Sequence, residues 1–140
     1  MRHEHMRNIS ASLTTAQIRQ SMERVKRGLR PVKDVTRRLG WLNLKAGERL
    51  QVCEKCQGLK PGESLLRLCV IEVISARREP LRRMIDELFY GIDEVGREGF
   101  SYAVDKNQWA SLFVRMFCTH MRCEPETVIT RIEFKYILPA

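Results

Sequence analysis

The chain has 140 residues, enough for one domain and too few for two independent hydrophobic cores. Apolar residues make up 44% and charged residues 30%, a composition that excludes an intrinsically disordered chain. Lysine and arginine number 25 against 17 aspartate and glutamate residues, so the formal net charge of +8 favours a polyanionic or phosphate-bearing partner.

No apolar run approaches the roughly 20 residues that a membrane-spanning helix needs. Residues 1–8 are polar and lack the apolar stretch of a signal peptide. We therefore expect a cytoplasmic protein with no membrane partner. In that compartment the five cysteines are expected to stay reduced rather than to form a disulfide framework.

Residues 1–13 show neither helical nor strand periodicity, and we expect a flexible leader followed by a single domain over residues 14–140. Thr14 and Gln17 fit a capping box, in which each side chain bonds the free backbone N–H of the other residue. Apolar residues then recur at helical spacing, and Gly28 is a typical helix terminator. This pattern predicts a short amphipathic helix.

Positive charge is most concentrated between residues 29 and 41, where Asp34 is the single acid. The basic residues of this segment are Arg30, Lys33, Arg37 and Arg38. Pro31 argues against a continued helix, so we expect a loop or an extended segment. Loops and extended segments of this kind often carry function on a rigid scaffold.

Two turns of similar sequence, residues 44–48 and 59–63, each lead into an apolar stretch and predict a following strand. The first strand covers about residues 49–53. The second covers residues 65–75 and is apolar on both faces, which predicts a central, buried strand.

Helices are predicted for residues 81–90, for residues 92–99 and, longer, after a cap at Asn107. The last residues alternate: the apolar side chains of Ile132, Phe134 and Tyr136 are expected to face inward, and the charged side chains of Arg131, Glu133 and Lys135 outward. Because strands and helices are mixed without a regular βαβ rhythm, we expect an α+β domain.

The segment Lys33-Asp34-Val35-Thr36-Arg37-Arg38 resembles the signature of the ASCH family, roughly G-x-K-x-x-T-x-R. Three further segments resemble family motifs and follow in the family's order: residues 44–48, 97–100 and 130–134. Together the motifs cover about residues 14–137. The chain departs from the signature at its glycine, because Gly28 lies five residues before Lys33 and the family's glycine lies two before.

This resemblance implies a small PUA-like β-barrel with flanking helices, and a cleft between them for RNA or a nucleotide-like ligand. Some small bacterial ASCH proteins are amidohydrolases that deacetylate N4-acetylcytidine with a Lys, a Thr and a Glu. Carried onto this chain, those positions are Lys33, Thr36 and Glu98. They would make Thr36 the nucleophile and Lys33 the base, while Glu98 orients the lysine or holds the substrate.

A threonine hydroxyl is a poor nucleophile unless a base takes its proton, and Lys33 can do so only when it is uncharged. In an extended segment, residues three apart point to opposite sides, so Lys33 and Thr36 meet only where the backbone turns. In the alternative, non-catalytic interpretation, Lys33 contacts a phosphate, Thr36 bonds its own backbone and Glu98 pairs with an arginine.

In the binding interpretation, Arg37 and Arg38 contact phosphates or bases, and Trp41 either stacks on a base or packs in the core. An RNA-binding or nucleotide-binding module is the leading hypothesis, and the amidohydrolase is the alternative. A third hypothesis is an accessory protein of a phage or prophage whose basic face meets a protein partner. No cofactor is expected.

The cysteines offer a second kind of site. Cys53 and Cys56 have zinc-knuckle spacing, and Cys118, His120 and Cys123 provide three further potential ligands. A closed zinc site needs four ligands, and the second group lacks a C-x-x-C pair. Redox C-x-x-C motifs usually open a helix, whereas Cys56 runs into a loop. We therefore interpret the cysteines as ordinary thiols and assign no metal ligands.

Overall fold

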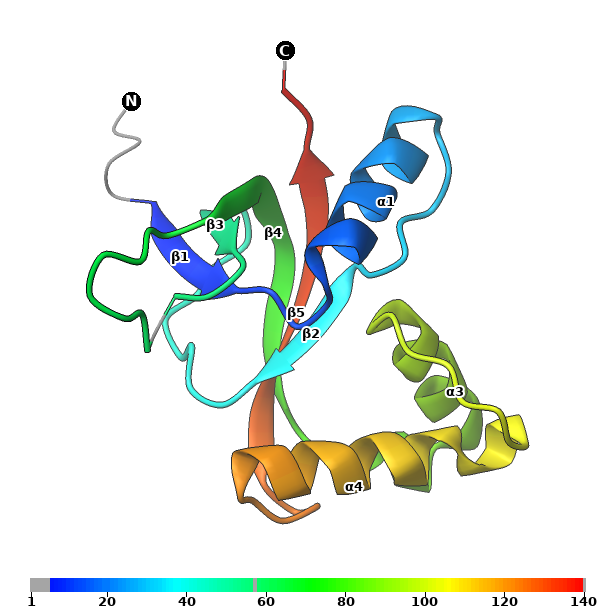
Figure 1. Ribbon diagram of the computed structural model, residues 1–140. Coiled ribbons are helices and arrows are strands. Elements are labelled where there is room, and N and C mark those ends of the chain that lie inside the picture. Colours follow the sequence, from blue (N-terminus) through cyan, green and yellow to red (C-terminus); the bar gives the residue numbers. More distant parts are fainter. Residues whose placement is uncertain (1–5, 57, 140) are drawn as a thin grey trace.

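The computed structural model describes residues 6–56 and 58–139 and contains a five-stranded mixed sheet in the order β1-β3-β4-β5-β2, with helices around it (Figure 1). The strands are β1 (Arg7–Ser10), β2 (Val35–Arg38), β3 (Arg49–Cys53), β4 (Arg67–Pro80) and β5 (Val128–Ile137). The helices are α1 (Thr15–Lys26), α2 (Arg83–Asp86), α3 (Leu88–Arg97), the 3₁₀ turn η2 (Lys106–Gln108) and α4 (Trp109–Met121). The predicted α+β class is confirmed.

The sheet curls into a half-barrel (Figure 1). The barrel is not closed, because β1 and β2 are the two edges of the sheet and are not paired with each other as strands. β3, β4 and β5 are antiparallel neighbours, and the edge strands are β1, parallel to β3, and β2, antiparallel to β5. Register shifts at Val52/Cys53 and Val73/Ser75 increase the local twist. The edges approach each other closely enough for the Arg38 guanidinium on β2 to donate to the carbonyl oxygen of Ser10 on β1, at 2.7 Å.

Alternate residues of the curled sheet fill its concave side. This core includes Leu50, Ile71, Val73, Ile132 and Phe134. α4 lies across one end of the sheet and α1 lies beside the other end (Figure 1). A second core, which includes Met84, Val95, Phe113, Phe117 and Ile129, joins α2, α3 and α4 to β5. Phe100 packs against both cores, so the segment after α3 lies at their junction.

Several local predictions are confirmed. The Thr14/Gln17 capping box is present at the start of α1, and the chain turns after the helix at Gly28, whose φ is 76°. The strand at residues 49–53 forms as predicted, and Ile132, Phe134 and Tyr136 face the core.

The leader prediction is wrong for Arg7–Ser10, which pair with β3 as strand β1. Residues 1–5 lie outside the described residues. Only four residues pair, and the parallel partner strand is more than 40 residues away in sequence, so no local periodicity marks this strand.

β4 is longer than predicted and buries one face rather than two. Ile74, on the outer face of β4, is 47% exposed, and Leu66, which precedes the strand, is 45% exposed. The predicted helix over residues 81–90 is interrupted at Glu87, whose extended backbone separates α2 from α3.

In the last helical region, Asp105 rather than Asn107 caps the chain, and it caps η2, which precedes α4. Met116, on α4, is 41% exposed and lines a pocket. None of the helices in the described part of the chain has the length and hydropathy that a membrane crossing requires.

Candidate functional site: a cleft between the curled sheet and helix α4

A pocket of about 490 Å³, referred to below as the cleft, lies where the end of the half-barrel meets α4. One wall is polar and includes Thr36, Arg38 and Glu98. The facing wall is mainly apolar and is formed by Phe100, Phe113, Met116 and Phe117, with His120 beside them. The ASCH-like motif residues on β2 and after α3 thus reach one hollow, although about sixty residues separate them in sequence.

A larger hollow of about 890 Å³ lies elsewhere, on the outer face of β3 and β4 and near the end of β5. Its lining includes Leu68, Val70 and Ile137. None of the six residues predicted as a site lines this hollow. The cleft is the better candidate because a buried carboxylate, Glu98, lies in its wall, whereas charged residues of the larger hollow such as Arg49 and Arg67 are exposed on the sheet surface.

The Lys33 ammonium lies 2.7 Å from Oε1 of Glu98 and also donates to the Glu98 backbone carbonyl at 3.1 Å. Both residues are 3% exposed. Burial lowers the pKa of Lys33, the ion pair with Glu98 opposes this, and the positive charges of Arg38 and Arg37 lower the pKa further. Lys33 is therefore a buried, paired cation whose charge depends on Glu98.

Backbone contacts fix the position of Lys33 just before β2. The carbonyl oxygen of Lys33 accepts from the Tyr136 hydroxyl at 2.8 Å, and the next N–H, of Asp34, donates to the Arg97 carbonyl at 3.0 Å. Gly99 follows Glu98 with φ of 91°, and a Cβ there would meet Leu13 at 3.0 Å. A glycine is needed here because the segment after α3 must turn and pack closely in order to deliver Glu98 to Lys33.

Thr36 and Arg38 are two residues apart on β2 and therefore point to the same side of the sheet. Thr36 is 3% exposed, and its Oγ1 accepts a hydrogen bond from Nε of Arg38 at 3.0 Å. Lys33 also adjoins both residues, since all three line a small cavity of about 20 Å³ beside the cleft. Among the described residues, however, no hydrogen bond joins the Lys33 ammonium to the Thr36 hydroxyl.

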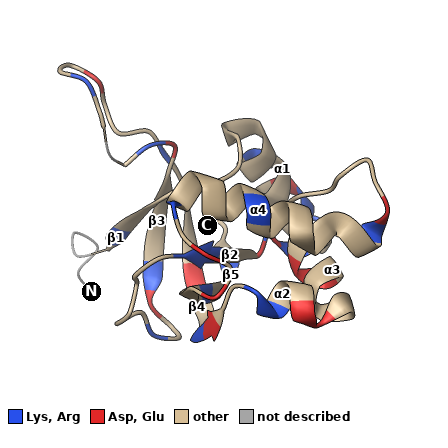
Figure 2. Cartoon of the chain, turned by 90° about the horizontal axis from the view of Figure 1, so that it is seen from below, with Lys and Arg blue, Asp and Glu red and all other residues tan. Residues whose placement is uncertain are grey.

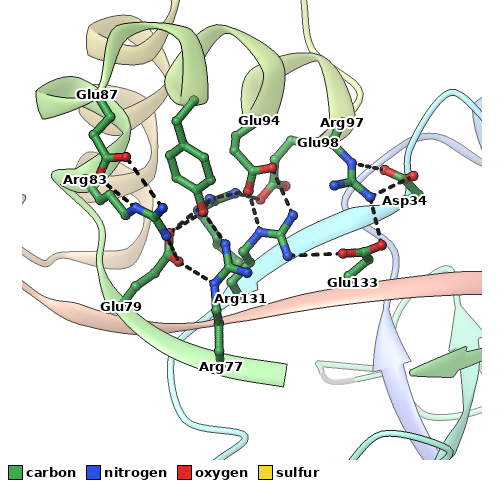
Figure 3. A network of polar contacts seen from close by, with 12 residues as sticks. Asp34, Arg77, Glu79, Arg83, Glu87, Glu94, Arg97, Glu98, Arg131 and Glu133 are labelled. Carbon is green, nitrogen blue, oxygen red and sulfur yellow. Dashed lines mark hydrogen bonds and ion pairs between the residues drawn. The ribbon is translucent and has the colours of Figure 1, made fainter. Parts of the chain in front are cut away.

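Behind the cleft, a buried ion network joins the outer face of the sheet to α3 (Figure 3). Arg37 is at its centre: its side chain has no exposed surface, and it bonds Glu94 at 2.5 Å, Glu98 at 3.3 Å and Glu79 at 3.3 Å. Its two terminal nitrogens thus bond three carboxylates, and its Nε has no partner among the described residues. Arg37 also borders the cleft, but its side chain is turned into the network, where it holds Glu98, and its contact with a ligand stays a prediction.

Glu94 completes the network by accepting from both Arg37 and Arg131. Burial alone would raise the pKa of Glu94, but the bonds and charges of Arg131 and Arg37 outweigh it and lower the pKa to about 2. A hydrogen bond from the Tyr90 hydroxyl to Glu79, at 2.7 Å, extends the network to its edge. The polar wall of the cleft is therefore backed by fixed, mutually compensating charges.

Arg38 differs from the other cations of this region. Its Nε and Nη2 donate to neutral acceptors, the Thr36 hydroxyl and the Ser10 carbonyl, and no described carboxylate lies within ion-pair distance of it. Burial lowers the pKa of Arg38, and the charge of Glu98 only partly offsets this. Lys33 and Arg37 bond carboxylates directly, whereas Arg38 brings a positive charge to the cleft without a bonded carboxylate among the described residues.

Trp41 lies apart from the other predicted site residues. Its indole packs against the concave core, and the Arg7 guanidinium lies 5.0 Å from the ring centroid. It does not line the cleft. This position fits the core interpretation of Trp41 better than base stacking.

Four network residues were not foreseen from the sequence: Glu79, Tyr90, Glu94 and Arg131. Arg131 was expected on the outer, solvent side of the last strand, yet it is 2% exposed because α3 covers that side. Charged residues in strict alternation indicate an outer face, but they do not reveal whether a helix covers it.

A metal site formed by the cysteines would be a separate kind of site. In the described ranges, no group of three or more His, Cys, Asp or Glu side chains is placed to hold a metal ion. Lys and Arg residues occur on strands, helices and loops around the molecule rather than on a single face (Figure 2). The charge that matters for a ligand in the cleft is therefore the local one, at Arg38.

No family model and no curated protein sequence matches the chain. A solved structure of a DUF984 protein from Enterococcus faecalis aligns over 94% of this chain and 80% of its own length, with a TM-score of 0.54 and 11% sequence identity. The two chains share a fold. The ASCH domain from Lactobacillus crispatus aligns over 94% of this chain and 79% of its own length, with a TM-score of 0.48 and 17% identity. At 11% identity the likeness to the DUF984 protein concerns the fold and leaves the function to the residues of the cleft.

Proposed function

We propose that the protein binds RNA or a nucleotide in the cleft, as an ASCH-type binding module. The observation that carries this proposal is Arg38, a part-buried guanidinium at the cleft without a carboxylate partner among the described residues. A cation in this setting is stabilised by an anion, and guanidinium groups are well matched to phosphate oxygens.

The walls of the cleft suit the remaining parts of a nucleotide. A volume of about 490 Å³ is in the range of small-ligand sites. Phe100, Phe113 and Met116 offer apolar and aromatic surface to a base, opposite the polar wall. Because Thr36 Oγ1 accepts from Arg38, the Thr36 hydroxyl hydrogen is left to donate to a ligand.

Titration with a fluorescein-labelled single-stranded RNA and with cytidine and adenosine monophosphates tests the proposal. We expect Arg38→Gln to weaken binding about 10-fold to 100-fold, the usual effect of losing a charge-assisted hydrogen bond. Arg30→Gln removes the same charge from an exposed site outside the cleft and is expected to change the affinity less than about threefold. Equal losses in both variants would show that binding depends only on net charge.

A second candidate function is amide hydrolysis, favoured by the convergence of Lys33, Thr36 and Glu98. Burial and the neighbouring arginines lower the pKa of Lys33, which is the direction a general base requires. In this scheme neutral Lys33 takes the Thr36 proton, the Thr36 oxygen attacks the amide carbonyl, and the amine leaves with that proton. Water then releases the acyl group from Thr36. The Lys33–Glu98 ion pair and the missing Lys33–Thr36 hydrogen bond make binding the better-supported function.

Incubation with N4-acetylcytidine separates the two functions. Hydrolysis would release cytidine, vanish in Thr36→Ala and recover in part in Thr36→Ser, which restores the hydroxyl. Absence of cytidine together with retained RNA binding would support the binding module alone.

A further inference from the structure

Two cysteines at the end of α4 lie close together. Sγ of Cys123 is 3.9 Å from Sγ of Cys118, and the backbone N–H of Cys123 donates to the Cys118 carbonyl at 3.1 Å. We propose that this pair is a thiol–disulfide site, oxidised by a peroxide and reopened by a thiol reductant. The proposal concerns the two thiols and holds whether or not the cleft binds a nucleotide.

The backbone brings the pair together. Arg122 follows α4 in the left-handed conformation, with φ of 54°, and turns the chain back over the last helical turn. The backbone hydrogen bond between the two cysteines holds the segment after α4 against the last helical turn, and the sulfur atoms need to approach by about 1.9 Å to form a bond of about 2.0 Å.

The other cysteines are placed less well for this reaction. Cys53 and Cys69 are buried, whereas Cys118 and Cys123 are both partly exposed and can meet an oxidant from solvent. Cys56 is also partly exposed and lies close to Cys53, but Cys53 is buried, its thiol contacts Asn8 Oδ1 and the Gln51 carbonyl at 3.7 Å, and burial together with Cys56 raises its pKa to about 11.

The chemistry balances with hydrogen peroxide as the oxidant. One thiol is oxidised to a sulfenic acid and water is released; the second thiol attacks that sulfur, a second water leaves, and both peroxide oxygens end as water. Burial, the hydrogen bond with Cys123 and the nearby acids raise the pKa of Cys118 to about 11. Either thiol can take the first step, because the two sulfur atoms lie 3.9 Å apart and both residues are partly exposed.

The site is coupled to the cleft through the chain between the two cysteines. His120 and Met121 lie in this turn, and both line the cleft. A disulfide would restrain the last turn of α4 and, with it, one end of the apolar wall.

Treatment of the full-length chain with a small excess of hydrogen peroxide, followed by mass spectrometry, tests the site. We expect a loss of about 2 Da, reversed by dithiothreitol. Trypsin cleaves after Arg122, so the disulfide would link the peptides of residues 116–122 and 123–131.

The Cys53→Ser/Cys56→Ser double variant is expected to retain the linked peptides, and Cys123→Ser to lose them. The proposal is overturned if the linked peptides are absent, if the link joins Cys53 to Cys56 instead, or if Cys118 and Cys123 gain oxygen atoms without losing 2 Da between them.

Discussion

The Lys33 ammonium and the Glu98 carboxylate lie 2.7 Å apart although 65 residues separate them in the sequence. Both are buried, and Glu98 is in turn held by Arg37. The pair joins the segment before β2 to the end of α3 and fixes the polar wall of the cleft. This arrangement explains why residues of such different sequence position share one site.

Removing the charge of Glu98 should be costly. In Glu98→Gln the buried Lys33 ammonium loses its carboxylate, and we expect the free energy of unfolding to fall by about 3–5 kcal/mol. Urea denaturation measures this loss. As a control, Glu126→Gln breaks an exposed ion pair with Arg82 and should cost at most about 1 kcal/mol. Similar losses in both variants would contradict the buried pair.

Gly99 should tolerate no side chain. Gly99→Ala must adopt φ near 91° and press a methyl group against Leu13, and we expect a loss of about 1–3 kcal/mol in stability, with weaker ligand binding because Glu98 shifts. Gly96→Ala is the matched control, since it lies within α3 with open space around it and should be neutral or stabilising by up to about 1 kcal/mol. If Gly99→Ala changed neither stability nor ligand binding, the close packing of Gly99 against Leu13 would not be required.

Acid should weaken the fold through Glu94. Its pKa is about 2 in the folded protein against 4.5 for an unperturbed carboxyl, so it contributes stability that is fully present above about pH 4.5 and lost as pH falls towards 2. The contribution is on the order of 3 kcal/mol. Unfolding free energies measured from pH 6 to pH 2.5 should therefore decline more steeply in the native chain than in Glu94→Gln. If the unfolding free energies of the two proteins declined in parallel with falling pH, Glu94 would not be the source of the acid sensitivity.

If the cleft hydrolyses an amide, the rate of hydrolysis should increase with pH. Because Lys33 acts as a base only when neutral, kcat/KM should rise with pH until Lys33 has lost its proton. Burial lowers the pKa of Lys33, so the rise should end below the pH expected for an exposed lysine. A kcat/KM that does not rise with pH anywhere below about pH 10 would exclude Lys33 as the base.

Much of the fold could be predicted because its signals are local. The capping box at Thr14, the turn before β3 and the alternation of Ile132, Phe134 and Tyr136 each depend on a few neighbouring residues. β1 could not be predicted, because four residues acquire strand geometry only by pairing with the distant β3.

Only some residues of the cleft could be inferred from the sequence, because a sequence motif does not show which face of a strand a helix covers. The pattern of Lys33, Thr36 and Arg38 resembles a family motif and indicated a segment that borders the cleft, but it could not separate Arg37 from Arg38. These neighbours point to opposite faces of β2, one into the ion network and one to the cleft. Which face α3 covers depends on tertiary packing, and so the buried role of Arg131 was also missed.

The central claim is that a nucleotide occupies the cleft, and chemical-shift mapping tests it most directly. In the ¹⁵N-labelled protein, added cytidine monophosphate or a short RNA should move the backbone signals of Thr36, Arg38, Phe100 and His120. Perturbations confined to Leu68 and Val70 on the outer face of the sheet, or no perturbation at millimolar ligand, would contradict the account.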